Sequence, residues 1–152
     1  MFVFLITVFF AALCFAVFAW RRNTKNKTEL QRHSISPQEL HESIRSGGRV
    51  LLFDVRQPLD LLAYPEQIPG AQRIPPAEVL EKPSLIPKDQ DAVVYCTCPS
   101  DKTSRMVLDK ALALGFSRIR FLRGGLAAWK GVGFPVEPYT GTFSFSAEMR
   151  PG

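Results

Sequence analysis

Cysteine and histidine are scarce in this sequence, which has three cysteines and two histidines among 152 residues. An odd cysteine count that includes the close pair Cys96 and Cys98 does not fit the disulfide framework of a small secreted protein. We therefore expect reduced thiols. His33 and His41 are not at metal-ligand spacing from the cysteines, so the sequence predicts no metal site and no bound cofactor.

Net positive charge is small outside one short segment. The formal net charge is +5, and four positive side chains lie close together at Arg21, Arg22, Lys25 and Lys27. The rest of the chain is close to neutral and has no basic face with interleaved aromatic residues, which argues against a nucleic-acid partner. The basic cluster indicates instead the polar flank of a membrane segment.

Charged side chains are absent from the first twenty residues. A helix over residues 2–20 would span about 28 Å, close to the roughly 30 Å hydrocarbon core of a bilayer. We expect a transmembrane anchor there and partnership with the membrane. A cleaved signal peptide is the alternative, disfavoured because no positive side chain precedes the apolar stretch. The basic residues that follow predict a single-pass protein whose soluble domain is cytoplasmic.

The rest of the chain divides into three predicted parts. Residues 21–34 form a basic juxtamembrane linker, residues 35–138 a single domain, and residues 139–152 a C-terminal tail. Ser36-Pro37-Gln38-Glu39 is typical of a helix N-terminus, because serine three residues before glutamate can form a capping box and proline suits the first turn.

Short apolar runs alternate with a helical pattern in this domain. The runs 50–55 and 92–96 are typical of strands buried in a parallel sheet, and 117–122 predicts a third strand. The pattern of 103–114 predicts a helix. Its predicted buried stripe consists of Met106, Val107, Ala111 and Leu114. The alternation predicts an α/β fold with a central, mostly parallel sheet flanked by helices.

A polar loop joins the second predicted strand, which ends at Cys96, to the predicted helix. Unpaired N–H groups and the helix dipole make such a helix start attractive to anions. A cysteine in this position is expected to be largely thiolate. Lys102 and Arg105 add positive charge. The alternative is that Cys96 is only a small buried residue at the end of a strand.

Five segments, in this order along the chain, resemble the rhodanese-like domain family. They are Leu51 to Arg56 with its Asp-x-Arg, Ile68-Pro69-Gly70-Ala71 with Ile74-Pro75, Tyr95-Cys96, Gly115-Phe116, and Leu122 to Trp129 with Gly133 to Val136. The resemblance implies a three-layer fold and sulfur transfer. A cysteine thiolate would take sulfane sulfur from thiosulfate or a persulfide donor, and pass it to a thiol or cyanide. It also implies structural support from Asp54 and Arg56.

The cysteine loop departs from the family pattern, because it has no glycine and contains two candidate nucleophiles. Counting forward from the strand selects Cys96, whereas counting back from Gly115 selects Cys98. Pro99 would remove a backbone donor next to Cys98, and Lys102 lies where related loops keep a positive residue. We favour Cys96 as the catalytic residue, with Cys98 as the alternative. The expected substrate-binding loop comprises Thr97, Cys98, Ser100, Asp101, Lys102, Thr103, Ser104 and Arg105.

Two other functions are compatible with a cysteine loop. A phosphatase or arsenate reductase would need an arginine six residues after the cysteine, whereas position 102 is lysine and Arg105 is out of step. A non-catalytic rhodanese-like docking or sensing module at the membrane is the second alternative, because the loop is atypical. The leading expectation is a membrane-anchored sulfurtransferase that acts on a small sulfur donor and a thiol acceptor.

Overall fold

The structure is a computed structural model that describes residues 14, 15, 17–21, 28, 30–97 and 100–141. The chain divides into two compact units between His33 and Ser34. All strands of the described residues belong to the second unit. The limits predicted for the linker, the domain and the tail stay predictions.

In the first unit, the described residues 14, 15 and 17–21 are helical and exposed. Most of the predicted membrane anchor, residues 2–13 and 16, lies outside the described residues. Within the described ranges, no helix combines the length and the apolar character that crossing a membrane requires.

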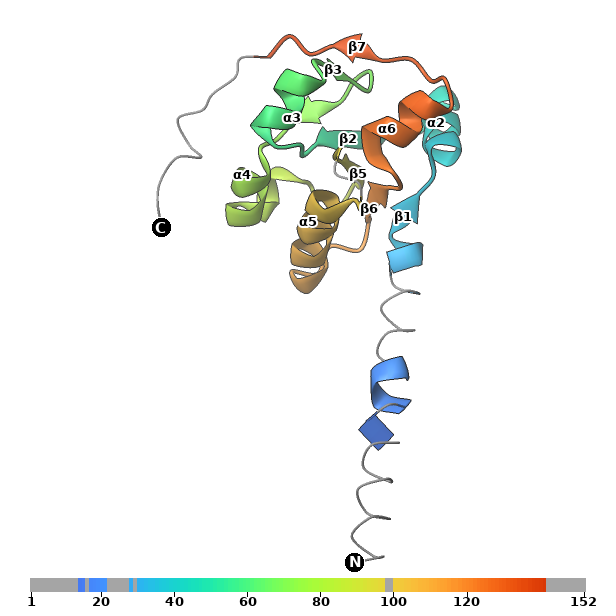
Figure 1. Cartoon of the computed structure of the whole chain (residues 1–152), viewed down its shortest axis with the longest axis vertical. Coiled ribbons are helices and arrows are strands. Elements are labelled where there is room, and N and C mark those ends of the chain that lie inside the picture. The colour runs from blue at the N-terminus through green and yellow to red at the C-terminus, as the bar shows by residue number, and fades with distance from the viewer. Residues whose placement is uncertain (1–13, 16, 22–27, 29, 98–99, 142–152) are drawn as a thin grey trace, which may run out of the picture. The chain divides into compact units, whose positions relative to one another are not determined.

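The second unit is built on a five-stranded sheet in the order β1-β6-β5-β2-β4 (Figure 1). The strands are β1 (Ser34–Ile35), β2 (Val50–Asp54), β4 (Gln72–Arg73), β5 (Asp91–Tyr95) and β6 (Ile119–Leu122). Every neighbouring pair is parallel, with Leu52 opposite Val93 and Val94 opposite Phe121. The predicted parallel sheet is confirmed. Its inner strands are continuous apolar runs because helices cover both of their faces.

Helices form the other two layers. They are α2 (Pro37–Arg45), α3 (Pro58–Ala63), α4 (Pro76–Glu81), α5 (Lys102–Ala113) and α6 (Gly125–Gly131), with a 3-10 turn at Pro83–Leu85. On one face, Leu40 of α2 and Trp129 of α6 join a buried cluster with Leu52 and Val93. Helix α5 packs on β5 and β6, with α4 beside it, on the other side of the sheet (Figure 1). The three-layer α/β fold is therefore confirmed.

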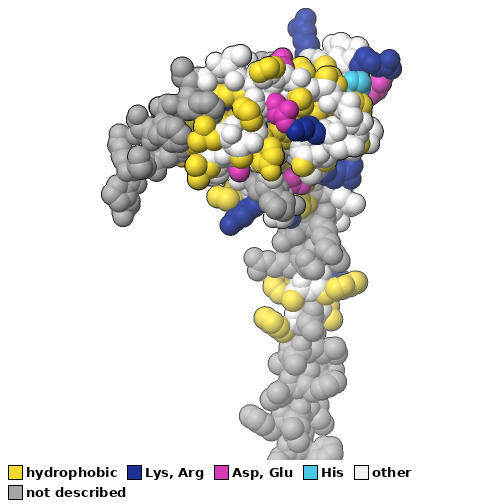
Figure 2. All heavy atoms as spheres, turned by 45° about the horizontal axis from the view of Figure 1, so that its top comes forward, with side chains coloured by type: hydrophobic (Ala, Val, Ile, Leu, Met, Phe, Trp, Pro, Cys, Tyr) yellow, Lys and Arg dark blue, Asp and Glu magenta, His cyan; other side chains and the backbone are white. Residues whose placement is uncertain are grey.

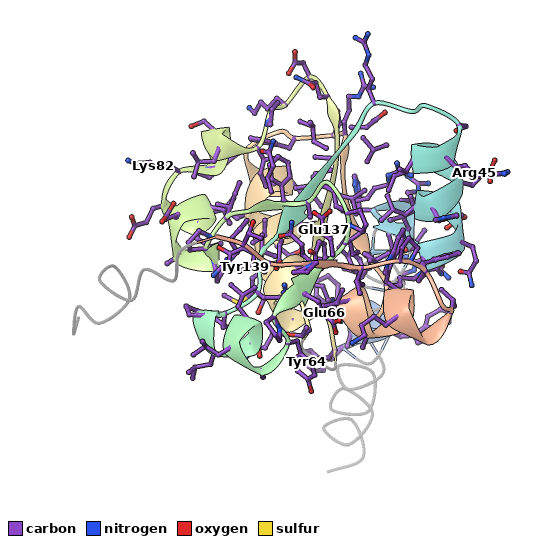
Figure 3. The ribbon with its side chains drawn as sticks, turned by 90° about the horizontal axis from the view of Figure 1, so that it is seen from above. Arg45, Tyr64, Glu66, Lys82, Glu137 and Tyr139 are labelled. Atoms are coloured by element: carbon purple, nitrogen blue, oxygen red, sulfur yellow. The ribbon has the colours of Figure 1, made fainter. Side chains whose placement is uncertain are left out.

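A two-stranded antiparallel sheet joins β3 (Glu66–Gln67) to β7 (Glu137–Pro138), as Figure 3 shows around the labelled Glu66 and Glu137. The side chain of Gln67 donates to Glu137 Oε1 over 2.8 Å, and the Gly70 N–H donates to the same oxygen over 3.2 Å. Lys130 of α6 forms an ion pair with Glu66. This small sheet joins the C-terminal end of the domain to the proline-rich stretch, residues 58–87, which lies between β2 and β5.

The buried face of α5 differs from the predicted stripe. Val107 and Ala111 are buried as expected, but Met106 and Leu114 are 48% and 45% exposed. The face toward the sheet is instead Ser104, Val107, Leu108 and Ala111. These positions follow the i, i+3, i+4, i+7 spacing of one helix face. The prediction was wrong for Met106 and Leu114 because a polar residue, Ser104, belongs to the buried face.

Helix α2 begins with the predicted capping box. The Glu39 N–H donates to Ser36 Oγ over 3.2 Å, and the Ser36 N–H donates to Glu39 Oε2 over 2.8 Å. The hydrogen bonds from the Ser36 backbone and hydroxyl lower the pKa of Glu39. The capping box therefore contributes fully to stability at pH values above the usual pKa of glutamate. This contribution is lost as the pH falls through the lowered pKa of Glu39.

Replacement of Ser36 by alanine should lower the free energy of unfolding by about 1 kcal/mol, because the Glu39 N–H loses the Ser36 hydroxyl as its acceptor. Urea denaturation near neutral pH measures the effect, and the difference should shrink in acid as Glu39 protonates. Ser117→Ala, at an exposed position, is the control. An unfolding midpoint that is the same in all three proteins would contradict this account of the helix start.

Candidate active site

Cys96 directly follows β5 and is fully buried. Its carbonyl oxygen accepts a hydrogen bond of 3.1 Å from the Leu126 N–H, at the start of α6. Gly125 has a φ of 51°, and a Cβ there would overlap the Cys96 carbonyl oxygen. The turn between β6 and α6 therefore packs directly on the backbone of Cys96, and only glycine can occupy position 125 without displacing it.

The far end of the cysteine loop is held by the same turn. Asp101, the N-cap of α5, adopts a left-handed conformation with a φ of 53°. Its Oδ2 accepts a hydrogen bond of 2.9 Å from the Gly124 N–H. Burial raises the pKa of the Asp101 carboxyl, while the Gly124 N–H and the charge of Arg105 oppose that rise. The loop is thus fixed at both ends, whereas Cys98 and Pro99 lie outside the described residues.

Three buried polar atoms at this loop have no hydrogen-bond partner in the described structure. They are Thr97 Oγ1, Asp101 Oδ1 and Ser104 Oγ. Ser104 lies in the first turn of α5 and is fully buried. Buried polar groups in folded proteins are nearly always paired, because an unpaired group costs free energy. Their concentration in the cysteine loop and the first turn of α5 is typical of a site whose hydrogen-bonding capacity is reserved for a ligand.

The other residues of the predicted substrate-binding loop are more accessible. Ser100 and Lys102 are exposed, whereas Thr103 and Arg105 are partly buried. Lys102 is the first residue of α5. Its ammonium group therefore adds positive charge at the solvent side of the helix start, where the helix dipole already favours an anion.

Asp54, Arg56 and Tyr95 form a buried network next to the cysteine loop. All three side chains are fully buried. The Arg56 guanidinium donates to both oxygens of Asp54 over 2.5–2.9 Å. The Tyr95 hydroxyl donates to Asp54 Oδ2 over 3.1 Å. Tyr95 immediately precedes Cys96, so the network fixes the end of β5 to the end of β2.

The same network anchors the proline-rich stretch. Arg56 donates to the carbonyls of Tyr64 and Glu66 over 3.0 and 2.8 Å, and the Ile68 N–H donates to the Tyr95 hydroxyl over 3.3 Å. Burial raises the pKa of Tyr95, so the hydroxyl stays protonated and can donate. Asp54 and Arg56 were expected to give structural support, whereas Tyr95 was named only in the segment that opens the cysteine loop, without this role.

The remaining features lie outside the cysteine loop. His41 stacks on Phe134 with a ring separation of 4.0 Å. No group of three or more metal-ligating side chains occurs in the described ranges. A cavity of about 500 Å³ lies near Lys82, Lys88 and Phe116, away from Cys96. On the described part of the face drawn in Figure 2, basic, acidic and hydrophobic side chains are interspersed, without a continuous basic surface.

The profile of the rhodanese-like domain family matches residues 36–131, which include every strand of the five-stranded sheet except β1 and all the site residues above. This chain belongs to the rhodanese-like domain family. Among relatives of this rhodanese-like protein, a sulfurtransferase of Allochromatium vinosum is 32% identical over 104 residues, which cover 68% of this chain and 94% of that protein.

A second relative and a solved structure extend the comparison. The probable adenylyltransferase/sulfurtransferase MoeZ of Mycobacterium tuberculosis is 35% identical over 98 residues, covering 63% of this chain but only 24% of MoeZ. The crystal structure of a rhodanese-related protein from Thermoplasma volcanium has a TM-score of 0.58 and 28% identity, and covers 69% of this chain and 97% of that one. The likeness to MoeZ thus concerns a minor part of that protein.

Replacement of Gly125 by alanine should lower the free energy of unfolding by at least about 2 kcal/mol, because the new Cβ meets the Cys96 carbonyl oxygen at a positive φ. Gly131→Ala is the matched control in the same helix. Nothing lies within 4 Å of the Cβ position at Gly131, so that change should be neutral or slightly stabilising. Chemical denaturation of both variants measures the difference, and equal stability would contradict the close packing at Gly125.

Proposed function

We propose that this rhodanese-like protein is a sulfurtransferase that moves sulfane sulfur from thiosulfate or a persulfide donor to a thiol or cyanide. The observation that carries the proposal is the position of Cys96 at the start of the loop between β5 and α5, because this loop and the first turn of α5 carry buried hydroxyl and carboxylate oxygens without partners. The relative from Allochromatium vinosum, which carries the name sulfurtransferase and matches over nearly its whole length, supports it.

The reaction proceeds in two covalent steps. The cysteine thiolate attacks the outer sulfur of thiosulfate, the sulfur–sulfur bond of thiosulfate breaks, and sulfite leaves with the bonding electron pair. The enzyme then carries the sulfur as a persulfide anion. A thiolate or cyanide acceptor attacks this outer sulfur and regenerates the cysteine thiolate. Backbone N–H groups at the start of α5 and the Ser104 hydroxyl stabilise the anions of both steps.

Two observations bear on the identity of the nucleophile. Cys96 follows β5 directly and is fixed by the Leu126 N–H, which supports Cys96. Related loops commonly have a glycine three residues after the catalytic cysteine, and the left-handed Asp101 lies three residues after Cys98, which supports the alternative register. We propose Cys96, because its backbone is held at the end of β5 and because Pro99 removes the backbone donor that would follow a nucleophile at position 98. Cys98 is then a nearby thiol able to exchange with the persulfide.

Incubation of the full-length protein with thiosulfate, or with a low-molecular-weight persulfide, should add one sulfur atom, measured by intact mass. Cys96→Ser should abolish this gain, because the attacking thiolate is lost, and Cys98→Ser should retain it. The reverse pattern would assign the nucleophile to Cys98. No gain of sulfur by the unmutated protein from either donor would refute the sulfurtransferase proposal.

We further propose that residues 2–20 anchor the protein in a membrane as a single span, with the domain on the cytoplasmic side. The support is the sequence alone: an apolar run without charge, followed by Arg21, Arg22, Lys25 and Lys27.

The full-length protein should therefore remain in the membrane fraction after alkaline extraction, and Leu5→Arg combined with Leu13→Arg should release it, because arginine within a span is costly. In sealed vesicles that expose the cytoplasmic face, added protease should digest the domain. Digestion only from the opposite face would overturn the orientation, and full extraction of the unmutated protein would overturn the anchor.

A further inference from the structure

Asp101 places a carboxylate in a loop that, under the proposed function, receives a sulfur donor. This inference rests on that proposed function. The carboxylate is held in place: its backbone is left-handed, and its Oδ2 accepts from the Gly124 N–H over 2.9 Å. Asp101 makes no side-chain cap to α5, although it occupies the N-cap position. Its position is therefore determined by the turn between β6 and α6.

The Asp101 carboxylate and the Cys96 carbonyl are bound by the same turn, between β6 and α6. Gly124 binds the carboxylate and Leu126, two residues later, binds the Cys96 carbonyl. Consecutive Cα atoms are about 3.8 Å apart, so these two acceptors lie within roughly 13 Å of each other. At such a distance a carboxylate and an anionic donor at the cysteine repel each other measurably, because the partly buried loop screens charge less than water does.

The second carboxylate oxygen of Asp101, Oδ1, can distinguish between sulfur-donor molecules by the hydrogen bonds that they offer. Asp101 Oδ1 is buried without a partner, as are the hydroxyls of Thr97 and Ser104. A hydroxyl can donate to an anion, but an ionised carboxylate oxygen can only accept. Thiosulfate, a dianion with acceptor oxygens only, cannot satisfy Oδ1. A donor molecule that carries an ammonium group can.

We propose that Asp101 is a specificity-determining residue that disfavours thiosulfate and favours a persulfide bearing an ammonium group, as in cysteine persulfide. Arg105 partly neutralises the carboxylate but leaves Oδ1 unpaired. In the favoured reaction the cysteine thiolate attacks the outer sulfur of the persulfide, and the sulfur–sulfur bond of the donor breaks. The donor leaves as cysteine thiolate, and its outer S–H becomes the enzyme persulfide.

The test compares single-turnover sulfur loading of the full-length protein from thiosulfate, cysteine persulfide and N-acetylcysteine persulfide, the last of which lacks the ammonium group. The variant is Asp101→Asn, which keeps an acceptor for the Gly124 N–H and a residue type that tolerates positive φ. Asp109→Asn, at an exposed position in the same helix, is the control. Thermal unfolding of each protein verifies that the fold is retained.

The unmutated protein should load faster from cysteine persulfide than from its N-acetyl form. Asp101→Asn should remove this preference and accelerate loading from thiosulfate about tenfold, because one like charge is removed. Asp109→Asn should change neither. Unchanged donor ratios in Asp101→Asn, or an equal loss with all three donors, would overturn the assignment of specificity to Asp101. An unmutated protein that takes sulfur from no donor would instead refute the proposed function itself.

Discussion

The hydrogen bond from the Leu126 N–H to the Cys96 carbonyl is the contact on which the geometry of the site depends. It exists because β5 and β6 are parallel neighbours, so the turn after β6 lies beside the loop after β5. Gly125 permits the close approach, since any side chain there would meet the Cys96 carbonyl. The N–H of Gly124 then holds Asp101 at the other end of the loop. One short turn thus fixes both ends of the cysteine loop, at the carboxyl edge of the sheet where α/β proteins place their ligands.

The buried pair Asp54 and Arg56 fixes the neighbouring strand at the same edge. Removing two charges from water is costly, and the pair is tolerable only because further hydrogen bonds satisfy its remaining atoms. Arg56 uses its other donors on the Tyr64 and Glu66 carbonyls, and Asp54 accepts from the Tyr95 hydroxyl. These partners belong to β5 and to the proline-rich stretch. Burying these two charges costs free energy. The hydrogen bonds of the network hold β2, β5 and the proline-rich stretch in a single arrangement.

Much of the fold could be predicted because residues close together in the sequence determine its elements. The strands Val50–Asp54 and Asp91–Tyr95 are apolar runs bounded by polar residues, and the start of α2 is a capping box. The two-residue strands β1 and β4 were missed, since two residues carry no periodicity and pair only through the finished sheet. In the site, Cys96, Asp54 and Arg56 could be named from motifs. The bond from Gly124 to Asp101 could not, because it joins residues 23 positions apart.

The central claim is that the Sγ atom of Cys96, a residue held against the turn after β6, receives the sulfur. A crystal structure of the protein after treatment with a persulfide donor tests it most directly. The account predicts electron density for a second sulfur bonded to Cys96 Sγ, within hydrogen-bonding reach of the Ser104 hydroxyl and the N–H groups at the start of α5. A sulfur bonded to Cys98 instead, or an unmodified Cys96 in a protein shown by mass to carry the sulfur, would contradict it.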